Sequence, residues 1–119
     1  MPGINDHLDQ VKHNQRSLRL LRWLSSFFAD WLVTVQFYTA LHLVDAYLAT
    51  KNIHPTYHRL RGQYLFDDRQ LQMVYREYQD LENLSRTARY DVHPPTRQNL
   101  KDCASSLAVI QHHLRQLLP

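Results

Sequence analysis

The sequence predicts an all-α protein, an up-and-down helical bundle with four long helices and one short helix. Three observations support this fold class. The chain has 119 residues, which suits one domain spanning residues 1–119. It contains 2 Gly and 5 Pro, too few turn residues for an all-β sandwich or barrel. Apolar residues recur at helical spacing in several long segments, and polar or proline-containing stretches separate most of them.

Two long helices make up the first half of the chain. The first covers about residues 5–24, where apolar side chains recur at steps of three, four and seven. The second begins with Asp30 as its N-cap and continues to about residue 50. It is so apolar that we expect it to form the buried centre of the bundle. Gln36, His42 and Asp45 interrupt the apolar run, which disfavours a membrane-spanning role.

A loop and a short helix follow. Residues 51–55 form the loop, in which Pro55 keeps His54 out of helical geometry. Thr56 can then cap a short third helix that ends near Leu65.

Two long helices complete the chain. Asp67 and Asp68 begin the fourth, since acidic residues suit the N-terminal end of a helix dipole. This helix should stop after about Tyr90, because Pro94 and the proline after it cannot continue a helix. Thr96 is a suitable N-cap for the last helix, which runs to the C-terminal region.

Charge and cysteine content narrow the function classes. The net charge is +3 with histidine neutral, which permits contacts with phosphates but does not demand them. Cys103 is the single cysteine, which excludes an internal disulfide and a cysteine zinc cluster and fits a reducing cytoplasm. Residues 1–10 lack the charged-then-apolar order of a signal peptide. We therefore expect a cytoplasmic protein without membrane contact.

Several common chemistries find no matching residues. Gly3 and Gly62 stand alone, so neither glycine-rich phosphate-binding motif can be written. His54 and His58 are four residues apart, but the first precedes a proline and no third metal ligand is evident. Ser85, Ser105 and Cys103 lack a recognisable base partner, and no Glu-x-x-His pair is present. We expect no cofactor and no bound metal.

The candidate chemistry lies between the fourth and fifth predicted helices. Arg86 and Arg89 are three residues apart, so they neighbour each other along one helix face. His93 follows and can fold back over that turn, held by the prolines after it. An arginine offers a forked set of donors that fits a phosphate, and a histidine exchanges protons near neutral pH. Together they are the minimum set for cleaving RNA without a metal.

The same residues also have a purely structural interpretation. Arg86 and Arg89 can cover the carbonyls at the helix end or pair with Asp91 or Glu82. His93 would then only cap the helix. Spacing alone favours this second interpretation, because cations are common near helix C-termini.

Other polar and aromatic residues were weighed in the same way. His42 and Asp45 can bind each other as a buried pair or belong to a dimer cleft, and the pair is favoured. His112 and His113 are expected on the surface, and His7 and His13 receive no role. Tyrosines at helical spacing are more often core residues than base-stacking ones. Tyr90 is the exception, since it lies inside the Arg–His motif.

Three stretches give the chain a resemblance to the HEPN-domain family, helical bundles found in bacterial and archaeal defence systems and in some eukaryotic RNases. The predicted second helix, residues 30–48, is similar to the aromatic-small-small-apolar-His helix of that family. Residues 54–59 resemble the loop that follows it. Residues 86–93 have an arginine, six residues and then a histidine, which fits the Arg-x(4–6)-His signature of the family. The resemblance covers roughly residues 15–115.

The resemblance implies a metal-independent endoribonuclease in which Arg86 and His93 are the catalytic residues. It implies a homodimer whose two motifs face one cleft, and a defence or toxin–antitoxin role with a nucleotidyltransferase-like partner. Beside the motif, we expect the substrate, RNA or a nucleotide, to contact six further residues. These are Arg89, Tyr90, Thr87, His54, His58 and Arg59.

Two other functions remain open. Thr87 occupies a place where the family often has Asn, Asp or His, which favours a non-catalytic HEPN bundle that binds RNA, a nucleotide or a partner protein. The third hypothesis is a structural helical bundle without a nucleic-acid role. Failure to bind any RNA at low salt would favour that hypothesis.

Overall fold

The computed structural model describes the backbone of residues 1–23, 25–90 and 94–119, and the side chains of residues 1–20, 29–90 and 94–119. Within these ranges the protein is all-helical, as predicted, and contains no strand. Six helices lie in the described ranges: α1 (Ile4–Trp23), α2 (Ser25–Ala49), α3 (His58–Asp67), α4 (Arg69–Gln72), α5 (Tyr75–Tyr90) and α6 (Arg97–Arg115).

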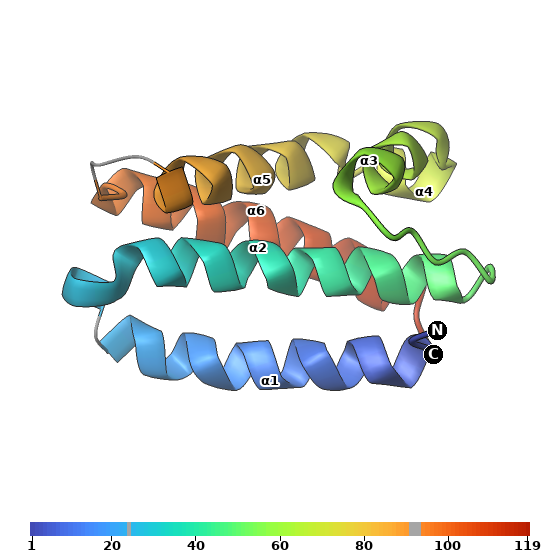
Figure 1. Cartoon of the computed structure of the whole chain (residues 1–119), viewed down its shortest axis with the longest axis horizontal. Coiled ribbons are helices and arrows are strands. Elements are labelled where there is room, and N and C mark those ends of the chain that lie inside the picture. Colours follow the sequence, from blue (N-terminus) through green and yellow to red (C-terminus); the bar gives the residue numbers. More distant parts are fainter. Residues whose placement is uncertain (24, 91–93) are drawn as a thin grey trace.

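The four long helices, α1, α2, α5 and α6, run alternately up and down (Figure 1). The short helices α3 and α4 lie together at one end of the bundle, and both chain termini lie at that end. The C-terminal end of α5, the start of α6 and the start of α2 lie at the opposite end. The predicted up-and-down bundle is confirmed.

Helix α2 forms the centre of the bundle, as its composition predicts, and packs against α1, α5 and α6. Residues Ala29–Ala49 are long and apolar enough to cross a membrane, but 78% of that window is buried inside the bundle. The apolar side chains therefore serve the protein core. Fully buried members from α2, α4, α5 and α6 include Val33, Phe37, Val44, Leu48, Leu71, Leu81, Ile110 and Leu114.

The sequence analysis joined α4 and α5 into one helix, which is wrong. Helix α4 ends at Gln72, and the backbone N–H of Val74 donates to the carbonyl of Leu71 at 3.0 Å, a tightened turn before α5. The carbonyl of Gln70, which would accept from the Val74 N–H in a continuous helix, instead lies 2.8 Å from Nε2 of His113 on α6. Asp68, the N-cap of α4, accepts hydrogen bonds from Tyr47 at 3.0 Å and Lys51 at 2.7 Å, which fix the start of α4 against the end of α2.

Two predicted N-caps are also wrong, and one is confirmed. Helix α2 begins at Ser25, so Asp30 lies inside it. The N-cap of α3 is Tyr57 rather than Thr56, because the extended chain continues one residue farther past the proline. Thr96 caps α6, accepting from the N–H of Asn99 at 3.0 Å, while the Asn99 side chain accepts from the Thr96 N–H at 2.9 Å.

Candidate functional site

An almost fully buried ion pair anchors α3 to α2. The Arg61 guanidinium donates to both carboxylate oxygens of Asp45, at 2.7 Å from Nε and 3.0 Å from Nη2, and each side chain is only 8% exposed. Nη2 also lies 3.4 Å from the carbonyl of Pro55. Burial alone would lower the pKa of Arg61, but the hydrogen bonds and charge of Asp45 outweigh burial and raise it. The pair fixes the first turn of α3 against α2.

The predicted pairing of His42 with Asp45 is therefore wrong. A guanidinium fits both oxygens of the carboxylate at once, which an imidazole cannot do. His42 instead contacts His7 of α1, with their Nδ1 atoms 3.1 Å apart. Burial lowers the pKa of both imidazoles, and for His42 the neighbouring His7 lowers it further. His7, to which the sequence assigned no role, thus joins α1 to α2.

A small cavity lies beside these groups. It has a volume of about 120 Å³, and its lining includes His7, Asp45, His54 and Pro55. The Nε2 atom of His54 lies 3.3 Å from the side-chain oxygen of Asn52. The half-buried His54 therefore lies with His7 and Asp45 at this cavity, apart from the end of α5 where the Arg–His motif begins.

One carboxylate on α5 brings two predicted site residues together. Oε1 of Glu82 is 3.6 Å from Nη2 of Arg86, one turn later on the same helix. Oε2 of Glu82 is 3.9 Å from Nδ1 of His58, the first residue of α3. From sequence, Glu82 is predicted only as a structural partner of Arg86 or Arg89. Its second role depends on α3 folding back over α5, which spacing along the chain does not reveal.

The predicted phosphate contacts lie at the exposed end of α5. Nη1 of Arg89 donates to Oγ of Ser85 at 3.1 Å and lies 3.5 Å from the hydroxyl of Tyr38 on α2. The guanidinium is 5.9 Å from the ring centroids of both Tyr38 and Tyr90. Tyr90 is 81% exposed, so one of its faces is open to a base.

Two other predicted residues lie elsewhere, and one lies outside the described residues. The Thr87 hydroxyl donates to the carbonyl of Asn83 at 3.0 Å, and Thr87 lines a cavity of about 170 Å³ at the start of α6. It therefore faces α6, away from Arg86. Arg59 is exposed on the first turn of α3. His93 lies outside the residues that the structure describes.

Tyr78 of α5 lies in the core against Phe37 of α2, with ring centroids 5.6 Å apart. Its side chain is 1% exposed, and its hydroxyl has no hydrogen-bond partner among the described residues. Burial raises the pKa of Tyr78, against the opposing charge of Arg61. The tyrosine is therefore a neutral polar group buried near Glu82 and the ion pair of Asp45 and Arg61.

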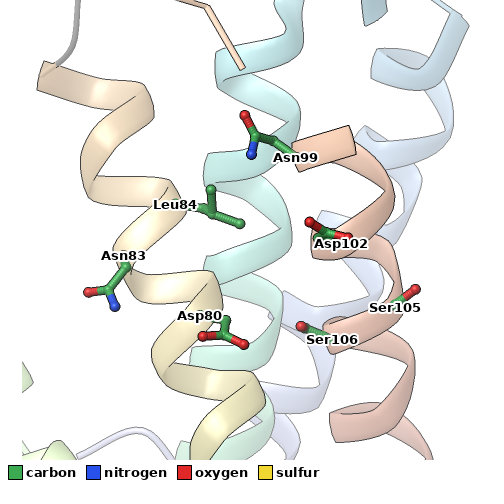
Figure 2. Close-up of a pocket in the computed structure, with 7 residues that line it drawn as sticks. All are labelled: Asp80, Asn83, Leu84, Asn99, Asp102, Ser105 and Ser106. Atoms are coloured by element: carbon green, nitrogen blue, oxygen red, sulfur yellow. The ribbon is translucent and has the colours of Figure 1, made fainter. Parts of the chain in front are cut away.

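A separate groove lies between α5 and α6, with a volume of about 470 Å³. Figure 2 shows Asp80 of α5 and Asp102 and Ser106 of α6 pointing into the space between the helices. Two carboxylates repel a phosphodiester, so this groove does not suit an RNA backbone. Among the described residues, no group of three or more His, Cys, Asp or Glu side chains is arranged to hold a metal ion.

Comparisons with protein-family models, with curated proteins and with solved structures found no match to this chain. The site is therefore interpreted from its own chemistry. That chemistry consists of exposed guanidiniums and an exposed tyrosine at the end of α5, and an imidazole that shares a carboxylate with one of those guanidiniums.

The half-buried His113 corrects one further prediction. It was expected on the surface, but its Nε2 atom lies 2.8 Å from the backbone carbonyl of Gln70 in α4. The contact joins α6 to the short helix and lies at the opposite end of α5 from the Arg–His motif.

Proposed function

We propose that the chain is a metal-independent endoribonuclease of the HEPN type that acts in the cytoplasm. One observation carries the proposal: Arg86 and Arg89 lie exposed on the last two turns of α5, three residues apart, with the exposed Tyr90 beside them. Two guanidiniums on one face suit two phosphate groups of an RNA backbone, and the tyrosine offers a stacking surface for a base. In this proposal Arg86 binds the phosphate that is cleaved and Arg89 binds a neighbouring one.

The reaction proposed is an internal transesterification. The ribose 2′-oxygen loses its proton and attacks the adjacent phosphorus, and the bond from phosphorus to the 5′-oxygen breaks as that oxygen gains a proton. The products are a 2′,3′-cyclic phosphate and a 5′-hydroxyl. Arg86 stabilises the extra negative charge on the phosphoryl oxygens in the transition state, and His93 moves one of the two protons.

The test is cleavage of an end-labelled RNA in the presence of a chelator. His93→Ala and Arg86→Ala are each expected to slow cleavage by about 100-fold or more. Arg76→Ala is the matched control, because Arg76 is exposed on the first turn of the same helix, and it should change the rate by less than about twofold. Cleavage that survives His93→Ala at the wild-type rate would overturn the proposal.

A second candidate function is binding of RNA, a nucleotide or a partner protein without cleavage. The observation that favours it is the orientation of Thr87, whose hydroxyl donates to its own helix backbone and adds nothing to the face of Arg86. This function predicts salt-sensitive binding that leaves RNA intact and weakens on Arg86→Ala or Arg89→Ala. Turnover above that of His93→Ala excludes it.

We further propose a homodimer, with a nucleotidyltransferase-like protein as the neutralising partner in a defence or toxin–antitoxin pair. Trp31 is 58% exposed in the second turn of α2, and the start of α2 lies at the same end of the bundle as the exposed Tyr90 (Figure 1). Two copies that bury these aromatic side chains against each other would bring two Arg–His motifs to one cleft.

A further inference from the structure

The proposed cleavage requires two proton transfers, whereas the Arg–His motif of one chain supplies a single imidazole. We infer that His58, oriented by Glu82, is the general base that takes the proton of the ribose 2′-hydroxyl. The inference rests on the proposed function and adds a catalytic residue from α3 to the motif on α5.

The position of His58 is fixed by the fold. It is the first residue of α3, three residues before Arg61, whose buried pairing with Asp45 anchors that helix turn to α2. The ring of His58 also lies over the core residue Phe37, with centroids 6.0 Å apart. About half of the His58 side chain remains open to solvent. The imidazole therefore packs against Phe37 on one side, and its other side is accessible to a substrate.

The contacts of Glu82 define the role of each nitrogen. Nδ1 of His58 faces Oε2 of Glu82 at 3.9 Å, which is longer than a hydrogen bond. The inference requires the exposed ring to turn toward Glu82 until Nδ1 and Oε2 are within hydrogen-bond distance. Catalytic hydrogen bonds are often long before substrate binds. With the Nδ1 proton directed at Glu82, Nε2 carries the lone pair and can accept the 2′-hydroxyl proton. Glu82 is thus a positioning residue.

The same carboxylate places the base beside the phosphate ligand. Nη2 of Arg86 is 3.6 Å from Oε1 of Glu82, so His58 and Arg86 lie on opposite oxygens of one carboxylate. In this proposal Arg86 binds an RNA phosphate so that the 2′-hydroxyl of the ribose attached through its 3′-oxygen lies on the His58 side of α5. The base becomes an imidazolium during attack, and the Glu82 carboxylate stabilises that charge. The proton for the 5′-oxygen then comes from His93.

The decisive experiment uses two RNA substrates in chelator. One is ordinary RNA, and the other has sulfur in place of the bridging 5′-oxygen at the cleavage site. A thiolate leaves without a proton, so the sulfur substrate removes the need for the general acid but not for the base. On ordinary RNA, His58→Gln and His93→Gln should each be slower by about 100-fold or more. On the sulfur substrate, His93→Gln should recover to within about tenfold of wild type, and His58→Gln should not.

A pH profile provides a readout that a structural role would not move. The charged groups that face His58 are Glu82 and, through that carboxylate, Arg86. A general base acts only when unprotonated, so the pH dependence of the cleavage rate should differ in form between wild type and His58→Gln. Glu82→Gln should slow cleavage by about tenfold and keep the form of the wild-type pH dependence. His13→Gln, an exposed histidine on α1, should leave both the rate and the profile unchanged.

The outcomes separate this inference from the proposed function. Wild-type protein that does not cleave RNA in chelator overturns both. Cleavage that depends on Arg86 and His93 but proceeds at the wild-type rate in His58→Gln overturns only the inference, as does rescue of His58→Gln by the sulfur substrate. Tight binding of an uncleavable 2′-O-methyl RNA by His58→Gln shows that the variant has folded and that its lost cleavage supports the inference.

Discussion

At the scale of single residues, the ion pair of Asp45 and Arg61 fixes the first turn of α3 to α2. Each charge is almost removed from water, and each compensates the desolvation of the other through two short hydrogen bonds. Removing one partner leaves the other buried and uncompensated, which costs more than the pair itself contributes. The pair therefore controls where α3, and with it His58, lies against α5.

Arg61→Ala is expected to lower the free energy of unfolding by about 3–5 kcal/mol, measured by urea denaturation. The double variant Asp45→Leu/Arg61→Met should lose less than the sum of the single changes, because no unpaired charge remains. Arg59→Ala, an exposed arginine two residues earlier, serves as the control and should stay within about 0.5 kcal/mol of wild type. Equal losses for Arg59→Ala and Arg61→Ala would contradict this account of the pair.

The sequence predicts part of this arrangement. Asp45 stands in a very apolar helix, so the sequence predicts a buried partner and favours His42, three residues away. The true partner comes from the next helix and depends on the path of the loop through Pro55. The contact of His7 with His42 spans 35 residues, and no local pattern indicates it.

At the scale of helices, α1 is attached mainly to α2, and the contact between His7 and His42 lies at this interface. Two imidazoles with facing Nδ1 atoms can share one proton but not two, so the contact requires that they are not both charged. Burial lowers the pKa of both below the ordinary value of 6.5.

The unfolded chain therefore binds more protons than the folded chain just below pH 6.5. The stabilising contribution of the two neutral imidazoles is fully present above pH 6.5 and is lost as the pH falls below that value. The free energy of unfolding, measured by urea denaturation between pH 7.5 and pH 5, should decrease toward acid pH in wild type. The decrease in the free energy of unfolding should be smaller in His7→Asn than in wild type. The control His13→Asn should show the same decrease as wild type. A His7→Asn protein with the wild-type pH dependence would show that this contact is not the cause.

Helix boundaries show where sequence patterns stop being informative. Apolar spacing and proline positions predict the four long helices, and the capping residues Thr96 and Asp68 are also found by sequence. The break between α4 and α5 contains no glycine or proline. At this break the carbonyl of Gln70 faces His113 of α6 instead of the Val74 N–H, a contact between distant helices that a single helix pattern does not contain.

At the scale of the whole molecule, the bundle separates two regions. One end holds both termini, the short helices and the cavity beside His54, and the other end holds the exposed end of α5 with the start of α2 (Figure 1). His58 joins the two regions, because it belongs to α3 but contacts the middle of α5 through Glu82. The sequence predicts the residues of the Arg–His motif. It does not predict the contact of His58 with Glu82, because that contact depends on how α3 packs against α5.

The proposed dimer is tested by light scattering. The chain has a mass of 14.2 kDa, and we expect a particle of twice that mass at micromolar concentration. Trp31→Asp should shift the particle toward the monomer and reduce RNA cleavage, since a charge in an apolar contact is costly to bury. Lys12→Asp, at an exposed position on α1, is the charge-changing control. A wild-type monomer under these conditions would contradict the shared cleft.

The central claim is that an arginine and the histidines near it cleave RNA through its own 2′-hydroxyl without a metal. The most direct test compares ordinary RNA in chelator with the same RNA carrying one 2′-deoxy nucleotide at the cleavage site, with analysis of the product ends. We predict 2′,3′-cyclic phosphate ends from the first and no cleavage at the substituted position of the second. Cleavage of the 2′-deoxy linkage, or cleavage that begins only when a divalent cation is added, would contradict the account.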